Sequence, residues 1–91
     1  MGIDAGASLT TGIRNTFIGN DAGFSATTAN ENTTLGYRAG QAISDTSKNK
    51  NVCIGKGTFD VVAGQDSVAI GFEAGRVSSS ASSVYLSLIH I

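Results

Sequence analysis

The clearest pattern in the chain is a five-residue segment in which apolar positions alternate with polar or small ones. It has Asn or Ser, then Thr or Val, a variable residue, Ile or Leu, and a closing Gly. It occurs at residues 15–19, 32–36, 51–55 and 67–71, and again at 83–87 with Ser in place of the glycine. Alternation with a period of two is typical of β-strands, whose successive side chains point to opposite faces. The pattern therefore predicts a short strand at each of these places.

The second and fourth positions of each predicted strand share one face. They are mostly β-branched or aliphatic, so we expect them to point inward; they are Thr16, Thr33, Val52, Val68 and Val84, with Ile18, Leu35, Ile54, Ile70 and Leu86. The middle position then points outward. An uncharged outward column with two aromatic residues is a candidate subunit interface, and an ordinary strand surface is the alternative. This column consists of Phe17, Thr34, Cys53, Ala69 and Tyr85.

Each predicted strand runs into a second motif, Gly-x-x-Ala-Gly, which is typical of a tight turn with one small inward residue. The inward residues of this turn are Ala5, Ala22, Ala39, Thr58 and Ala74. A further inward set follows three residues after the second glycine position, and it comprises Leu9, Ala26, Ile43, Val62 and Ser78. The remaining residues of each unit are polar, and 44–50 is the longest such loop.

The two motifs together define a repeat unit. Its anchoring positions, 16 to 19 residues apart, are Gly2, Gly19, Gly36, Gly55, Gly71 and Ser87. Units this short exclude helix-based repeats, so we expect residues 1–87 to form one all-β array, a β-solenoid or parallel β-roll of short coils. Both ends of the sequence fall inside a unit, which indicates a segment of a longer array. Residues 88–91 lie outside the repeat, and both a native tail and non-native sequence stay open for them.

Composition narrows the class of protein further. Glycine accounts for 12 of the 91 residues, proline and tryptophan do not occur, and 14% of the residues are charged. Small side chains cannot fill a wide core, yet a hydrophobic fraction of 41% and a net charge of −1 are not typical of a disordered chain. The scattered basic residues argue against nucleic-acid binding, and no apolar run is long enough to cross a membrane. The single cysteine excludes an internal disulfide.

The repeated motif Asn-Thr/Val-x-Ile/Leu-Gly-x-x-Ala-Gly, with its Ser- and Thr-rich spacers, resembles the shaft repeats of bacteriophage tail-fibre proteins. Residues 67–71, Ser-Val-Ala-Ile-Gly, are also similar to the head repeats of trimeric autotransporter adhesins, which form left-handed parallel β-rolls. The resemblance covers residues 2–87 and departs from the motif at Thr58-Phe59, where Ala-Gly is expected. It implies a homotrimeric extracellular fibre, on a virion or a bacterial cell surface, that contributes to attachment. It implies no catalytic residue.

Some residues that carry chemistry in other proteins are better explained here by the repeat. Cys53 occupies a position that holds Ala in another unit and has no histidine near it in sequence, so we expect it to pack rather than react. His90 lies in the tail beyond the repeat. Residues 55–58, Gly-Lys-Gly-Thr, lack the upstream glycine and the hydroxyl residue after the lysine that a phosphate-binding loop requires.

The remaining polar residues also predict no ligand site. No calcium-binding loop pattern surrounds Asp21, Asp45, Asp60 or Asp66. The aligned Asn15, Asn32 and Asn51 are expected to form a hydrogen-bonded ladder between neighbouring coils. We therefore predict no catalytic, cofactor-binding or metal-binding residue.

The sequence favours a structural role, as a segment of a phage tail fibre or surface adhesin that supports host or surface attachment. Its expected partners are copies of itself in a homotrimer, and a host-surface glycan or protein would be bound through domains that this segment lacks. The alternative is an ice-binding or carbohydrate-binding β-solenoid module. An ice-binding array needs a flat, regular outward column of threonine, and the mixed outward column argues against one. An enzyme on a β-helix needs clustered acids, bases or arginines on adjacent coils, and the basic residues show no such alignment.

Overall fold

The computed structural model describes residues 1–46, 48–60, 64–75 and 82–86. In these residues the regular secondary structure consists of short strands without a helix. The strands are β1 (Thr16–Ile18), β2 (Thr33–Leu35), β3 (Val52–Ile54), β4 (Val68–Ile70) and β5 (Val84–Tyr85). Each lies within one of the segments where the alternating pattern predicts a strand.

The strands form one parallel sheet in the order in which they occur in the chain, β1-β2-β3-β4-β5. Each residue pairs with the residue in the same position of the next unit, as in the pairs Thr16↔Thr33 and Thr33↔Val52. This register extends beyond the strands, because the Gly36 N–H donates to the Ile18 carbonyl at 2.8 Å and the Gly23 N–H donates to the Ala39 carbonyl at 2.9 Å. The prediction of an all-β, parallel arrangement built from the repeat is confirmed.

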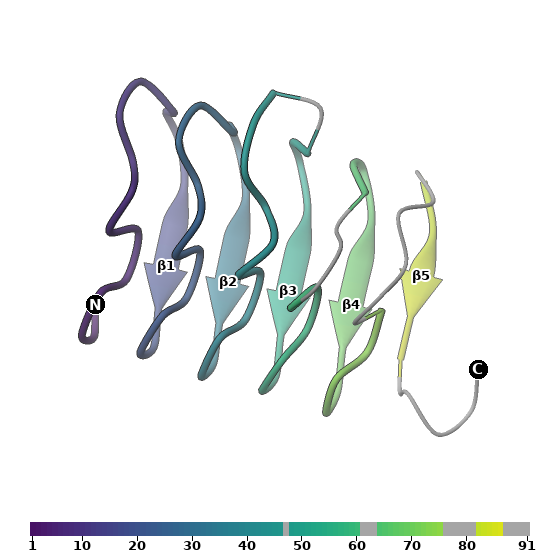
Figure 1. Ribbon diagram of the computed structural model, residues 1–91. Helices are drawn as coiled ribbons and strands as arrows, with labels where there is room; N and C mark the ends of the chain where they lie inside the picture. Colours follow the sequence, from purple (N-terminus) through teal and green to yellow (C-terminus); the bar gives the residue numbers. More distant parts are fainter. Residues whose placement is uncertain (47, 61–63, 76–81, 87–91) are drawn as a thin grey trace.

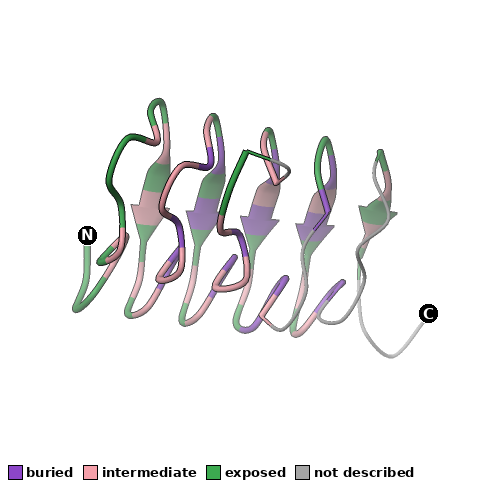
Figure 2. Ribbon diagram, turned by 45° about the horizontal axis from the view of Figure 1, so that its top comes forward, coloured by how far each residue is buried: buried purple, intermediate pink, exposed green. Residues whose placement is uncertain are grey.

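The described parts of the segments that connect the strands pass over the same face of the sheet (Figure 1). The sheet therefore has an inner face, which these segments cover, and an outer face, which they leave open. Figure 2 shows the difference at the central strands, where buried positions alternate with less buried ones. The core lies between the inner face and the connecting segments, and its buried cluster is small: Ala29, Ala39, Ile43, Cys53, Phe59, Ala69 and Ala74.

The glycine that follows each of β1, β2 and β3 is required by the close stacking of neighbouring units. Gly36 has φ 132°, and a Cβ placed on it would lie 2.9 Å from the carbonyl carbon of Gly55. Residues that carry a side chain rarely adopt this backbone conformation. The space that a side chain would need here is occupied by the backbone of the next unit. Positive φ and close approach therefore occur together at these glycines.

The orientation predicted for the strand residues is wrong. The middle positions, predicted to form an outward subunit interface, face the interior: Thr34, Cys53 and Ala69 are fully buried, and Phe17 and Tyr85 are half-buried. The second and fourth positions, predicted to point inward, are exposed or half-buried. The column formed by Phe17, Thr34, Cys53, Ala69 and Tyr85 therefore does not provide an exposed stripe for a partner.

The reversal follows from the narrow space beneath the inner face. In the units that have it, the second glycine of the turn lies against a middle strand residue: a Cβ on Gly40 would be 2.5 Å from Thr34 Cγ2, and a Cβ on Gly23 would be 2.5 Å from Phe17 Cδ1. A three-residue strand turns either one or two side chains to a given face, because successive residues alternate. A space bounded so closely by backbone has room for one inward residue per strand, so the aliphatic pair is left outside.

The small inward residues of the turn are placed as predicted, since Ala22, Ala39, Thr58 and Ala74 are buried and Ala5 is half-buried. The second inward set is confirmed at Ala26 and Ile43. Leu9, in the first unit of the described residues, differs, with 40% of its surface exposed. Val62, Ser78, Ser87 and residues 88–91 lie outside the described residues.

Candidate functional site

The outer face of the sheet is a regular surface formed by two columns of strand residues, and none of these residues is charged. One column has Thr or Val at every unit: Thr16, Thr33, Val52, Val68 and Val84. The other has Ile or Leu: Ile18, Leu35, Ile54, Ile70 and Leu86. The exposed fraction of the four residues from Ile18 to Ile70 is nearly constant, at 41%, 44%, 36% and 40%. From Ile18 to Ile70 the Ile/Leu column thus presents a similar aliphatic surface at each step, while the other column changes from Thr to Val and Leu86 is 67% exposed.

Charged residues flank this face at the corner that precedes the strands. Arg14, Glu31, Lys50 and Asp66, followed by Ser82, are all exposed and all adopt positive φ, between 53° and 61°. Backbone bonds between units hold them one above the other; for example, the Glu31 N–H donates to the Ile13 carbonyl at 3.0 Å. The charges of the first four residues alternate, so that each neighbouring pair from Arg14 to Asp66 is opposite in sign. Stacked like charges would be destabilising, which accounts for the alternation within one chain.

At the opposite corner, the residue after each closing glycine forms another exposed column. Lys56 Nζ lies 5.9 Å from the centre of the Tyr37 ring and 5.5 Å from the centre of the Phe72 ring, in the units on either side. Tyr37 and Phe72 are 47% and 58% exposed. Two cation–π contacts therefore link three successive units and leave aromatic surface open to solvent.

Beneath the charged corner lies the predicted ladder of asparagines. Asn15 Oδ1 accepts a hydrogen bond from the Asn32 N–H at 2.9 Å, and Asn32 Oδ1 accepts one from the Asn51 N–H at 2.9 Å. Asn51 Oδ1 accepts from the Ser67 N–H at 3.1 Å, and the Ser67 hydroxyl accepts from the Ser83 N–H at 3.2 Å. Each side chain satisfies a backbone group of the next unit, so the prediction of a ladder is confirmed and its role is structural.

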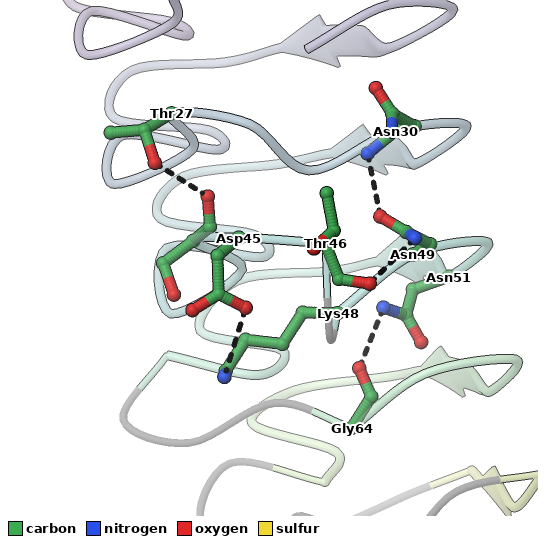
Figure 3. Close-up of polar contacts among 9 residues, drawn as sticks. Thr27, Asn30, Asp45, Thr46, Lys48, Asn49, Asn51 and Gly64 are labelled. Atoms are coloured by element: carbon green, nitrogen blue, oxygen red, sulfur yellow. Dashed lines mark hydrogen bonds and ion pairs between the residues drawn. The ribbon is translucent and has the colours of Figure 1, made fainter.

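The longest connecting segment contains its own set of polar contacts (Figure 3). The Asp45 carboxylate pairs with Lys48 Nζ at 3.7 Å, and the Lys48 N–H donates to the Asp45 carbonyl at 2.9 Å. Asn49 Nδ2 donates to the Thr46 carbonyl at 2.7 Å, while Asn49 Oδ1 accepts from the Asn30 N–H at 2.8 Å. The extra residues of this unit thus form a local turn and preserve the stacking on either side.

The inner column holds the candidate nucleophile. Cys53 is fully buried, and burial raises the pKa of its thiol from 9.0 to about 12, a shift that a hydrogen bond with the Thr58 side chain partly opposes. A thiol with so high a pKa is protonated at neutral pH and is a poor nucleophile. This agrees with the expectation that Cys53 packs rather than reacts.

The other candidate residues are not brought together. Among the described residues, no three His, Cys, Asp or Glu side chains lie close enough to hold a metal ion. Asp60 pairs with Arg38 at 3.2 Å, and Asp45 pairs with Lys48. Lys56, the lysine of the phosphate-loop-like segment, lies over the two aromatic rings. His90 is outside the described residues.

Sequence reasoning identified the residues of the outer face but placed them inside. The sequence signal that could have located these residues is how much the side-chain size varies from unit to unit at each strand position. The second and fourth strand positions keep similar residues from unit to unit, whereas the middle position ranges from Ala to Phe. A position in a confined interior must vary with its neighbours, while an open, repeating face has no such requirement.

The part of the chain that the structure describes contains no helix long and apolar enough to cross a membrane. A scan against protein-family models finds no match to this chain. Searches among curated proteins and among solved structures likewise find no match.

Proposed function

We propose that the chain is a structural segment of a fibre, a β-solenoid of stacked coils that supports attachment to a host or surface. The observation that carries the proposal is the continuous in-register stacking of units, in which strands, turns and the asparagine ladder all bond to the equivalent residues of the next unit. A stack of this kind resists bending because each unit is tied to its neighbour at several points around its circumference. The resemblance of the motif to phage tail-fibre and adhesin repeats supports the same role.

The role is mechanical, and it requires no reacting group. Such a rod would hold a recognition domain at a distance from the particle or cell that carries it. The partners in this proposal are copies of the same chain, assembled as a homotrimer on a virion or bacterial surface. Because the outer face is uncharged and aliphatic, it is better suited to covering by protein than to permanent contact with water.

The proposal is tested by locating the chain in its source. Antibodies raised against the 91-residue chain and coupled to gold are applied to intact phage particles and bacterial cells, which are then examined by electron microscopy. Gold along thin filaments that project from the particle or cell is the expected result. Gold confined to the cell interior, or its absence from every filament, would overturn the fibre proposal.

A carbohydrate-binding module is the second candidate, and the exposed column of Tyr37, Lys56 and Phe72 favours it. Exposed aromatic rings offer a stacking surface for sugar rings, and Lys56 supplies a charge for an acidic sugar. A glycan array probed with the labelled chain and with its Tyr37→Ala variant tests this candidate. Binding that the variant loses would support the module, whereas the absence of binding to any glycan would exclude it.

A further inference from the structure

A charged residue precedes each of the strands β1 to β4, and these four residues are called here the corner charges: Arg14, Glu31, Lys50 and Asp66. We infer that the alternation of the corner charges specifies which units of the chain become neighbours. It favours pairing of a strand with the next unit over pairing with the unit after that. The inference concerns how the stack selects its own order, so it goes beyond the fibre proposal and is independent of it.

A chain of similar units must select the correct neighbour for each strand, because many of its contacts are interchangeable. The outward columns hold Thr or Val and Ile or Leu in each strand, and the asparagine ladder joins Asn15 to Asn32 and Asn32 to Asn51 by equivalent bonds. If β1 paired with β3 and the unit between them were looped out, Asn15 Oδ1 would meet the Asn51 N–H as it now meets that of Asn32. Misassembly of this kind is a characteristic failure of repeat proteins.

The corner charges distinguish the correct arrangement from the wrong one. In the observed stack, each neighbouring pair of corner charges is opposite in sign, as for Arg14 and Glu31. Pairing of β1 with β3 would place Arg14 beside Lys50. Pairing of β2 with β4 would place Glu31 beside Asp66. Opposite charges that face each other stabilise paired strands and like charges destabilise them, so the same four residues favour the correct neighbour and oppose the first wrong one.

The local structure of the corner supports this role. All four corner charges are exposed and have φ between 53° and 61°, a conformation that glycine and asparagine adopt more easily, so charge is present even where the backbone disfavours it. Backbone bonds hold the corner in register; for example, the Lys50 N–H donates to the Asn30 carbonyl at 3.1 Å. Units about 4.8 Å apart lie well within the ~10 Å screening length of 0.1 M salt. The corner charges therefore act before the side chains beneath the sheet are in contact.

The test rearranges the corner charges without changing the net charge of the chain. The rearranged variant combines Glu31→Lys with Lys50→Glu and has the order plus, plus, minus, minus. It places opposite charges on the units of β1 and β3 and like charges on the units of β1 and β2. The matched control, the reversed variant, changes all four signs and keeps the alternation; its substitutions are Arg14→Glu, Glu31→Lys, Lys50→Glu and Asp66→Lys.

Disulfide formation during refolding from urea reports which units pair. The pair Thr16→Cys and Val52→Cys reports pairing of β1 with β3. The pair Thr16→Cys and Thr33→Cys reports the native pairing of β1 with β2. Both pairs are made in a Cys53→Ala background, and the intrachain link is measured by mass spectrometry. In the native stack Thr16 and Val52 lie two strands apart, about 9.6 Å, which exceeds the ~7 Å that a disulfide can bridge between Cα atoms.

At low ionic strength, the rearranged variant should raise the β1–β3 link about fivefold over the unmodified corner and lower the β1–β2 link, whereas the reversed variant should change neither. In about 1 M salt, where the screening length falls to ~3 Å, the difference should disappear. Loss of structure alone does not produce this result, because an unfolded chain closes the shorter β1–β2 loop more readily than the longer one.

Circular dichroism shows whether each variant folds. Lys50→Glu alone, which also places opposite charges on the units of β1 and β3, is the second variant if the rearranged one does not fold. An equal β1–β3 link in the rearranged and unmodified chains would overturn the inference, and so would an equal rise in the reversed variant.

Discussion

The inner and outer faces of the sheet come from the same strands, but they differ in how much their residues vary from unit to unit. The inner column changes from Phe17 through Thr34, Cys53 and Ala69 to Tyr85, while the outer columns keep Thr or Val and Ile or Leu throughout. On the inner face, each residue must fit the backbone and side chains of its own unit. On the outer face, which the connecting segments leave open, no such fit is required, and each column keeps a narrow set of residue types.

Phe59 shows how the inner face compensates for variation. It replaces the usual glycine of the turn, adopts φ 47°, and is fully buried in the units where the strand residues Cys53 and Ala69 are small. Its ring packs edge to face against Tyr85, with the ring centres 5.8 Å apart. The departure from the motif is therefore a volume exchange, in which the turn supplies the bulk that the strands lack.

Among the tests of this comparison, removal of the Phe59 side chain should have the largest effect on stability. Phe59→Ala should lower the free energy of unfolding by about 3–4 kcal/mol, because it leaves a cavity in a narrow core. Urea unfolding followed by circular dichroism measures the change. The matched control is Phe72→Ala, at a residue 58% exposed, which should change the value by less than about 0.5 kcal/mol. Equal losses in the two variants would contradict the volume exchange.

Removal of one member of the asparagine ladder should have the next largest effect. Asn51 is fully buried, and its side chain donates to the Gly64 carbonyl at 2.9 Å and accepts from the Ser67 N–H. Asn51→Ala should cost about 2–3 kcal/mol, since both backbone groups lose their partner. Asn51→Ser should cost less, because Ser67 fills the same place in the next unit. A milder effect for alanine than for serine in urea unfolding would contradict this account.

Adjacent residues of one strand compare the two faces directly. Ala69→Leu adds bulk to the confined inner face and should cost about 1–3 kcal/mol. Val68→Leu alters the open face and should stay within about 0.5 kcal/mol. Differential scanning calorimetry at low protein concentration, where copies are apart, gives both values. If Val68→Leu proves the more harmful, the orientation of the strands must be reversed.

The smallest effect is a pH dependence that only the inner face can produce. Because the pKa of Cys53 is raised from 9.0 to about 12 in the folded chain, the folded state binds more protons than the unfolded state between these values. Stability from this group is fully present below pH 9 and falls as the pH rises, by about 1 kcal/mol between pH 9 and 10.

The contribution of Cys53 to this fall is the difference between the wild type and Cys53→Ala, measured by urea unfolding at each pH. Alanine is compatible with the site, since Ala69 occupies it in the next unit. Parallel pH curves for the two proteins would show that the thiol is not buried.

Much of the fold could be predicted from the repeat alone. The strands, the positive φ of the closing glycines and the asparagine ladder all follow from residue types at fixed spacing, because each reflects a local backbone requirement. The direction in which the strands face could not be predicted in this way. Alternation shows that Val52 and Ile54 share a face opposite Cys53, but not which face is covered, and that depends on how closely the Gly40 and Gly75 turns approach the sheet.

The candidate site could not be predicted for the same reason: the interface was predicted at the middle column that begins at Phe17, and the two columns that form the outer face were predicted to point inward. The hydrophobicity of Ile18 or Leu35 suggests burial within one chain, although burial between chains satisfies the same residue types. Single-residue preference cannot distinguish these two cases.

The in-register pairing also determines how the chain finds its native state. The side-chain hydrogen bonds that join neighbouring units link residues 13 to 19 positions apart, so no contact of this kind requires distant parts of the chain to meet. Adding a unit adds contacts at the same sequence separation, and the entropy of closing each loop stays constant as the stack grows. Folding can therefore begin at any pair of units and proceed along the array, at a rate set by the unit rather than by the total length.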